Sequence, residues 1–286
     1  MEENKKPFVL GLITARGGSV RLPRKNIKSF CGHPLVAWSI VQSKCSRLID
    51  ETVLTTDDDE IALVGEKYGA RVIRRLVLDN DITANVPLRM AVEELETNGM
   101  KIDHIVPMLP TSPLKRPSDL DNLIWSFNYH NSFWNNYKRT ELNVEENEMT
   151  TFSPDRECFV YENIEDMTNN YNIPYHLNSV IANKGWKYSR LCGGWSIGKR
   201  DYLMNKWRKA PDKDSVIDAN LMDYMFDRKD RILGYAIEPW QCFETDYDHY
   251  FNICEVLMEE FILKGAGMDV YIKYINNILK KESING

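Results

Sequence analysis

The sequence lacks several features that would place it in a particular class of protein. No apolar run approaches the roughly 18 residues that a membrane-spanning helix requires, so no membrane partner is expected. The six cysteines form no C-x-x-C pair, which argues against a zinc site and a disulfide framework and favours reduced thiols. The net charge of −6 argues against nucleic-acid binding, which normally requires a basic face. The polar beginning MEENKK shows no signal peptide, and a cytoplasmic enzyme is expected.

Short apolar runs alternate with amphipathic segments along most of the chain. The first run, FVLGLI at 8–13, is typical of a strand that is buried on both faces. Further strands are expected at 51–56, 71–73, 104–109 and 232–237, and helices at 34–45, 57–70, 86–96, 118–129, 247–263 and 268–280. This alternation predicts an α/β fold with a Rossmann-like, mostly parallel sheet flanked by helices.

The alternation stops between residues 130 and 190, which are rich in Asn, Glu, Tyr and Trp and show no clean period. We expect short strands and loops there, forming an inserted lid or an arm. The chain as a whole, 1–286, is expected to be one domain that carries this insertion.

Positive charge gathers in ITARGGSVRLPRKNIKSFCGHPL, residues 13–35, directly after the first expected strand. Its cations include Arg16, Arg21, Arg24, Lys25 and Lys28. Ligands of open parallel sheets bind at the carboxyl ends of strands, and Gly17 and Gly18 are expected to allow positive φ and a close approach to phosphate oxygens. The loop matches neither G-x-x-x-x-G-K-[ST] nor G-x-G-x-x-G. We therefore expect an anion site of another type, with a solvated basic loop as the alternative.

ARGGSVRLPRKNIKSFCGHPLVAWSI resembles the N-terminal signature of the cytidylyltransferases that make CMP-activated nonulosonic acids, roughly A-R-G-G-S-K-x-[IL]-P-x-K-N and then G-x-P-L. Further segments resemble family segments in the same order. They are TTDDDEIA (55–62), DITAN (81–85), LPTSPLKRPSDLD (109–121), GGWSIGKRDYL (193–203) and ETDYDHYF (244–251). The resemblance covers about residues 7–129 and 190–263.

This resemblance implies a fold of the nucleotide-diphospho-sugar transferase type, with the insertion serving dimerisation or as a lid. It also implies a homodimer and a reaction in which CTP and a nonulosonic acid give the CMP-sugar and pyrophosphate with Mg²⁺. By the same resemblance the catalytic residues are Arg16, Lys25 and Asp246. The nucleotide would be bound by Ala15, Arg16, Gly17, Gly18, Ser19, Arg21, Lys25, Asn26, Arg75, Thr83 and Asn85, and the acceptor by Leu109, Thr111, Ser112 and Lys115.

Glu244 and Asp246 are the expected metal ligands. They are spaced i, i+2, so on an extended segment both side chains point to one side, and carboxylate oxygens suit Mg²⁺. The alternative is that Asp246 or Asp248 caps the helix that follows.

The chain departs from the family pattern at several positions. Val20 stands where family members usually have a lysine that handles pyrophosphate, and Arg21 or Arg24 could substitute for it. Leu109 stands where the family has a glutamine that contacts the sugar, which suggests a different or less hydroxylated acceptor. Two alternatives therefore stay open: a related nucleotidyltransferase that uses another nucleotide or a sugar-phosphate-type acceptor, and a catalytically silent nucleotide-binding homologue.

Overall fold

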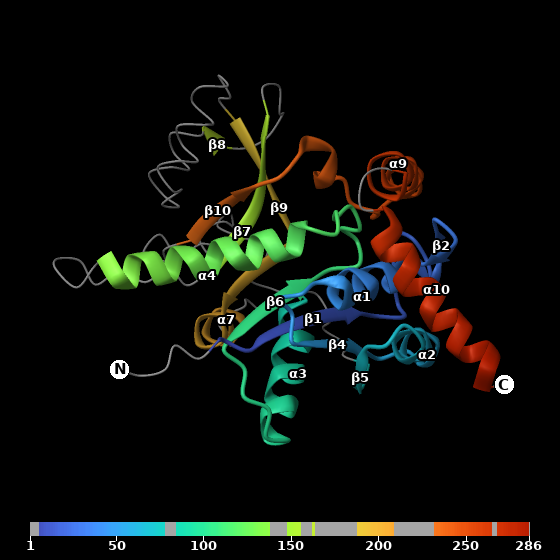
Figure 1. The fold of residues 1–286 in the computed structure, drawn as a ribbon. Coiled ribbons are helices and arrows are strands. Elements are labelled where there is room, and N and C mark those ends of the chain that lie inside the picture. The colour runs from blue at the N-terminus through green and yellow to red at the C-terminus, as the bar shows by residue number, and fades with distance from the viewer. Residues whose placement is uncertain are drawn as a thin grey trace.

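The computed structural model describes residues 6–77, 84–137, 148–155, 162–163, 188–208, 232–264 and 268–285. A central sheet runs in the order β10-β7-β9-β6-β1-β4-β5, with β8 paired to β9 (Figure 1). Its strands are β1 (Val9–Ala15), β4 (Glu51–Thr56), β5 (Arg71–Arg74), β6 (His104–Met108), β7 (Glu148–Asp155), β8 (Glu162–Asn163), β9 (Tyr188–Lys199) and β10 (Ile232–Ala236). Among these strands only β9 runs against the others, because its pairs with β6, β7 and β8 are antiparallel.

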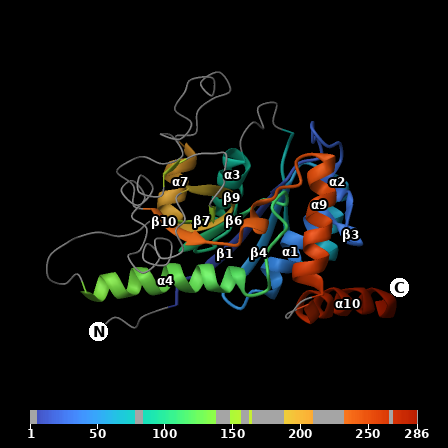
Figure 2. The same ribbon diagram turned by 90° about the horizontal axis from the view of Figure 1, so that it is seen from above.

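Helices cover both faces of the sheet (Figures 1 and 2). One face carries α3 (Asn85–Thr97) and α7 (Arg200–Arg208). The other face carries α1 (Leu35–Cys45), α2 (Asp59–Lys67), α4 (Asp119–Tyr137), α9 (Asp248–Met258) and α10 (Met268–Asn285). A small hairpin, β2 (Ser29–Phe30) and β3 (His33–Pro34), leads from the basic loop into α1.

The central strand β1 explains why the first apolar run is continuous. Val9 and Ile13 pack into the core beneath α1, whereas Leu10 and Leu12 pack into the core beneath α3. All four side chains are at most 1% exposed. A strand between two helical layers needs apolar residues on both faces, as the sequence predicted.

The α/β fold is confirmed, and most of the expected elements agree with the structure to within a few residues. The expected helix at 118–129 continues to Tyr137, and the expected helix at 247–263 is divided into α9 and a π-helical turn, Glu259–Leu263. The residue Pro34, expected in the first turn of a helix, precedes α1 instead. No described helix is long and apolar enough to cross a membrane.

The expected insertion at 130–190 is only partly described. Residues 138–147, 156–161 and 164–187 lie outside the described residues. Strand β7, which falls within the expected insertion, belongs to the central sheet, where it pairs with β9 and β10. The role of the rest as a lid or an arm stays a prediction.

Reduced thiols were expected throughout, and Cys31, Cys45 and Cys254 are indeed free. The expectation is wrong for Cys242, which is disulfide-bonded. The sequence did not predict this bond, because the spacing of cysteines along a chain does not show which of them the fold brings within bonding distance.

Gly11 lets α1 lie close against β1, and this contact gives a test of the core. An added Cβ at Gly11 would lie 2.3 Å from Ser43 Oγ, an atom that shares a 2.8 Å hydrogen bond with Thr52 Oγ1. We predict that Gly11→Ala lowers the free energy of unfolding by about 1 to 3 kcal/mol, measured by urea denaturation. In a Ser43→Ala background the cost should fall, because the crowded atom is gone. Equal costs in both backgrounds would contradict this account of the packing.

Candidate functional site

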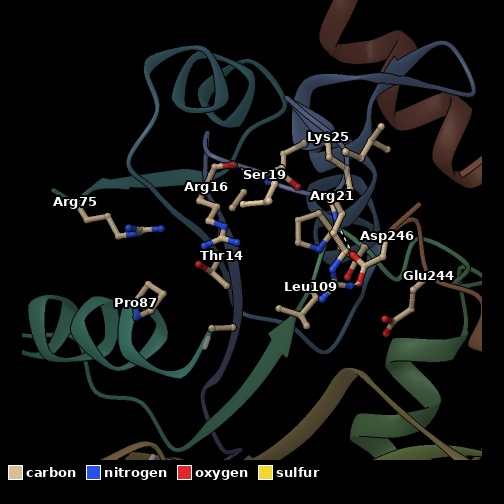
Figure 3. Close-up of a pocket in the computed structure, with 17 residues that line it drawn as sticks. Thr14, Arg16, Ser19, Arg21, Lys25, Arg75, Pro87, Leu109, Glu244 and Asp246 are labelled. Atoms are coloured by element: carbon tan, nitrogen blue, oxygen red, sulfur yellow. Dashed lines mark hydrogen bonds and ion pairs between the residues drawn. The ribbon is translucent and has the colours of Figure 1, made fainter. Parts of the chain in front are cut away.

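A cavity of about 330 Å³ opens at the carboxyl ends of β1, β5 and β6. Thr14 and Ala15 come from the end of β1, Arg75 follows β5, and Leu109 follows β6 (Figure 3). Strand β1 has β4 on one side and β6 on the other, so the cavity lies where the order of the strands reverses. This is where open α/β sheets bind their ligands.

The cavity brings together most of the residues that the sequence predicted. Those that line it are Ala15, Arg16, Ser19, Arg21, Lys25, Asn26, Arg75, Leu109, Thr111, Glu244 and Asp246. Asn85 begins α3 and does not line the cavity, although Ala84 and Pro87 beside it do. Thr83 lies outside the described residues.

Asp246 forms ion pairs with two cations of the basic loop. Lys25 Nζ lies 2.5 Å from Asp246 Oδ1, and Arg21 Nη1 lies 2.6 Å from Asp246 Oδ2. The Lys25 side chain is only 11% exposed, whereas that of Arg21 is 58% exposed. A cation as buried as Lys25 needs a nearby anion, because desolvating an unpaired charge is costly. Figure 3 shows these three side chains gathered on one side of the cavity and Arg75 on the opposite side.

Arg24 has a different role, because it faces α2 and does not line the cavity. It adopts a left-handed conformation, with φ of 56°, at the start of the 3₁₀ turn Lys25–Ile27. Its guanidinium pairs with Asp58, which caps α2, and lies 2.6 Å from Glu60 Oε2. The hydrogen bond from Arg24 holds the pKa of Asp58 below its usual value. Of the two arginines proposed to replace the missing lysine, only Arg21 therefore reaches the cavity.

The two glycines of the loop are used differently from what was expected. Neither Gly17 nor Gly18 has a positive φ. Gly17 is instead needed for close approach, because a Cβ there would lie 2.3 Å from Asp58 Oδ2, whereas a Cβ at Gly18 would have no atom within 4 Å. The Gly17 amide donates a 2.9 Å hydrogen bond to Asp57 Oδ1.

Asp57 is a residue that the sequence reasoning missed. Besides accepting from Gly17, its carboxylate lies 3.4 Å from Arg75 Nη1, and both side chains are at most 7% exposed. The segment TTDDDEIA, which carries Asp57, did match the family, and that match was the available signal. Cavity-lining residues that were not predicted as site residues are Thr14, Val20, Leu22, Ala84, Pro87 and Pro110.

The loop after β6 contributes Thr111 to the cavity lining, and its next residues contact the groups that surround the cavity. Thr111 lines the cavity, while Ser112 Oγ donates a 3.2 Å hydrogen bond to Glu244 Oε1. Lys115, expected to bind the acceptor, is fully buried, and its ammonium donates to the Ser112 carbonyl. Burial lowers the pKa of Lys115 to about 7, although the carboxylates of Asp119 and Glu244 oppose this shift. Ser112 and Lys115 do not line the cavity.

The two expected metal ligands, Glu244 and Asp246, both line the cavity. Asp246 does not cap the next helix, because the capping position is Tyr247, with no side-chain cap hydrogen bond, and α9 begins at Asp248. Among the described residues no group of three His, Cys, Asp or Glu side chains is arranged to hold a metal ion. Two carboxylates nevertheless fit Mg²⁺, which takes its other ligands from water and substrate phosphates.

The structure is that of an α/β protein with a cation-lined cavity at the carboxyl ends of its strands, which suits an anionic ligand. The family model described as cytidylyltransferase matches residues 10–183. The chain therefore belongs to the cytidylyltransferase family, which confirms the resemblance found in the sequence.

Several similar curated proteins are named after pseudaminic, legionaminic or N-acylneuraminic acid. The chain is 42% identical over 108 residues to pseudaminic acid cytidylyltransferase of Campylobacter jejuni, covering 37% of this chain and 47% of that protein. It is 44% identical over 82 residues to CMP-N,N'-diacetyllegionaminic acid synthase of the same species, covering 28% of this chain and 35% of that protein. The chain thus spans about half, or less, of the length of the curated relatives it matches.

Solved structures share the fold. CMP:2-keto-3-deoxy-manno-octonic acid synthetase, solved with CTP, aligns with a TM-score of 0.60 and 15% identity, over 88% of this chain and 99% of that chain. A cytidylyltransferase from Leptospira borgpetersenii aligns with a TM-score of 0.53 and 18% identity, over 96% of this chain and 95% of that chain. These likenesses support the fold that the sequence predicted.

The unequal surroundings of the two loop glycines predict unequal effects of the same substitution. Gly17→Ala should push the Asp58 carboxylate away from Arg24 and weaken CTP binding by about tenfold in calorimetry, since loop geometry depends on that pair. Gly18→Ala, the matched control, should change the affinity by less than about twofold, because its Cβ meets open space. Equal effects of the two substitutions would show that the contact with Asp58 does not shape the loop.

Proposed function

We propose that this protein transfers CMP from CTP to the anomeric hydroxyl of a nonulosonic acid and releases pyrophosphate. The observation that carries the proposal is the cation-lined cavity at the carboxyl ends of β1, β5 and β6, in a chain of the cytidylyltransferase family. Its volume of about 330 Å³ lies within the usual range for small-ligand sites.

In the proposed reaction the anomeric oxygen of the acceptor attacks the α-phosphorus of CTP. The new oxygen–phosphorus bond forms as the bond from the α-phosphorus to the bridging oxygen breaks, and the hydroxyl proton is released. Pyrophosphate leaves with the bridging oxygen. Arg16, Arg21 and Lys25 would offset the negative charge on the phosphates, because all three line the cavity. Positioning and charge neutralisation are the main contributions that a protein makes to such a transfer.

Glu244 and Asp246 would hold Mg²⁺ at the edge of the same cavity. The metal would neutralise charge on the phosphates and align them. Each Asp246 oxygen accepts from one cation, Lys25 or Arg21, and we expect metal and triphosphate to compete with these pairs. In this exchange of partners the two cations would pair with the phosphates instead of with Asp246, and Asp246 would coordinate the metal.

The acceptor is proposed to be a nonulosonic acid with fewer hydroxyl groups than sialic acid. Leu109, Pro110 and Pro87 contribute apolar side chains to the lining of the cavity, and Leu109 stands where the family resemblance implies a glutamine. An apolar side chain leaves a buried hydroxyl without a partner, which disfavours a heavily hydroxylated sugar. Pseudaminic and legionaminic acids, after which relatives of this chain are named, are the acceptors to test first.

A homodimer and a cytoplasmic location belong to the same proposal. The homodimer is carried over from the family resemblance, and the location from the expectation formed on the sequence. The molar mass of the purified protein in solution tests the first of these.

The reaction is tested by measuring pyrophosphate release with Mg²⁺ while each of CTP, GTP, UTP and ATP is offered with each acid of a panel. The panel contains pseudaminic, legionaminic, sialic, KDN and KDO-type acids. We expect release only with CTP and a nonulosonic acid, and a product whose mass is that of the CMP-sugar. Measurable CTP binding without release from any pair would contradict the proposal and favour a silent homologue.

The exchange of partners at Asp246 predicts opposite effects of one substitution on binding and on turnover. Without metal, Asp246→Asn should bind CTP more tightly by up to about tenfold, because Lys25 and Arg21 lose a competing anion. With Mg²⁺, its turnover should fall on the order of 100-fold, because a metal ligand is lost.

Asp248→Asn is the matched control for this test. Asp248 is two residues away, pairs with Lys28 at 2.8 Å and does not line the cavity. We expect neither CTP affinity nor turnover to change by more than about twofold, as is usual for an exposed pair. Weaker metal-free binding of CTP by Asp246→Asn would contradict the proposed competition.

A further inference from the structure

The loop from Thr111 to Lys115 is held by hydrogen bonds to five consecutive backbone carbonyls. The donors come from distant parts of the chain and from the loop itself. The Thr111 carbonyl accepts from Thr245 N, Ser112 from Lys115 Nζ, Pro113 from Gln42 Nε2, Leu114 from Gln241 Nε2, and Lys115 from the Tyr271 hydroxyl. These bonds fix the position of a buried loop, because a carbonyl that loses its donor away from water is costly. The carbonyls of Ser112, Leu114 and Lys115 have the one donor named here, whereas Thr111 also accepts from Thr245 Oγ1 and Pro113 from the Lys115 amide.

Tyr271 is the member of this set that lies farthest from the loop along the chain, 156 residues from Lys115. It belongs to α10, the helix that packs against α1 (Figure 1). Its hydroxyl lies 2.9 Å from the Lys115 carbonyl oxygen. We propose that Tyr271 is a positioning residue for the cytidylyltransferase reaction, acting through the loop at 111–115; this rests on the proposed function.

The ring and the hydroxyl of Tyr271 do different things. The side chain is 1% exposed, and its ring meets that of Trp38 edge-on at 6.4 Å between centroids. The ring therefore stabilises the core whether or not the hydroxyl is present. Burial raises the pKa of Tyr271 well above its usual value, so the hydroxyl remains a donor at working pH. Removal of the hydroxyl alone separates positioning from packing.

The loop at 111–115 connects Tyr271 to the cavity. Thr111 lines the cavity and accepts a 2.8 Å hydrogen bond from the Thr245 amide, which lies between the two proposed metal ligands. Ser112 Oγ donates to Glu244. A shift of the loop at Lys115 would therefore move the groups that set the position of Glu244, and small displacements of a site are expensive in catalysis.

Gln42 supports the same loop from α1. Its Nε2 donates a 2.6 Å hydrogen bond to the Pro113 carbonyl, and its side chain is buried. Its Oε1 has no hydrogen-bond partner among the described residues. A buried amide oxygen without a hydrogen-bond partner destabilises the fold, so Gln42 is not explained by packing alone. We infer that its contribution is the hydrogen bond to the loop.

The test compares two tyrosines of the same helix. Tyr271→Phe removes the hydroxyl that reaches the loop, while Tyr274→Phe removes a hydroxyl that donates at 3.0 Å to the Tyr68 carbonyl, away from the cavity. We expect Tyr271→Phe to lower kcat/KM for the acceptor by about tenfold, and Tyr274→Phe to change it by less than about twofold. Thermal unfolding of both variants measures any loss of stability.

Hydrogen exchange of the Ser112 and Lys115 amides, in protein without substrate, reports the position of the loop directly. Exchange should be faster in Tyr271→Phe and unchanged in Tyr274→Phe. Gln42→Met should also speed it while keeping the fold, which covers the case in which Tyr271→Phe does not fold. Unchanged exchange in Tyr271→Phe and Gln42→Met, or faster exchange without loss of turnover, would overturn the positioning role. Absence of wild-type turnover with every acceptor would instead refute the proposed function, and exchange would still decide whether Tyr271 holds the loop.

Discussion

The ion pair between Lys25 and Asp246 is the interaction on which the rest of the site depends. It joins residues 221 positions apart and brings the turn before α9 against the basic loop after β1. Lys25 is largely buried, and its pairing with Asp246 offsets the cost of desolvating the ammonium. The pair therefore keeps a cation in the cavity wall when no ligand is bound. The same carboxylate also holds Arg21, and thus one acidic group keeps two phosphate-binding candidates in place.

An acidic protein can keep a strongly basic loop because most of the loop cations, namely Arg21, Arg24, Lys25 and Lys28, pair with carboxylates. The ion pairs around the cavity, including that of Arg75 outside the loop, fall into two kinds. The pair of Arg24 with Asp58 anchors the loop to α2, outside the cavity, and the pair of Arg75 with Asp57 is buried in the wall. The pairs of Asp246 face the cavity, where a triphosphate and a metal can replace them. The anchoring pairs fix the conformation of the site. The exchangeable pairs keep cations in the cavity, where they can contact a bound triphosphate.

Much of the fold and of the site could be predicted from the sequence. The apolar run of β1 and the segment 51–56 are strands because they pack on both faces, and the basic loop lies at the carboxyl end of β1 because parallel strands end at one edge. The sequence did not predict the features that depend on where a side chain points. The sequence identified Lys115 as a cation near the acceptor, but only the fold turns its ammonium toward the Ser112 carbonyl. The need for Gly17 likewise comes from a neighbour on α2, and not from its φ angle.

The most direct test of this account is a crystal structure with CTP and Mg²⁺ bound. The account predicts that Lys25 and Arg21 contact phosphate oxygens, that Asp246 and Glu244 contact the metal, and that the pairs between Asp246 and the two cations are broken. A nucleotide bound in the cavity with those pairs intact would contradict the exchange. A nucleotide bound elsewhere on the protein would contradict the assignment of the site.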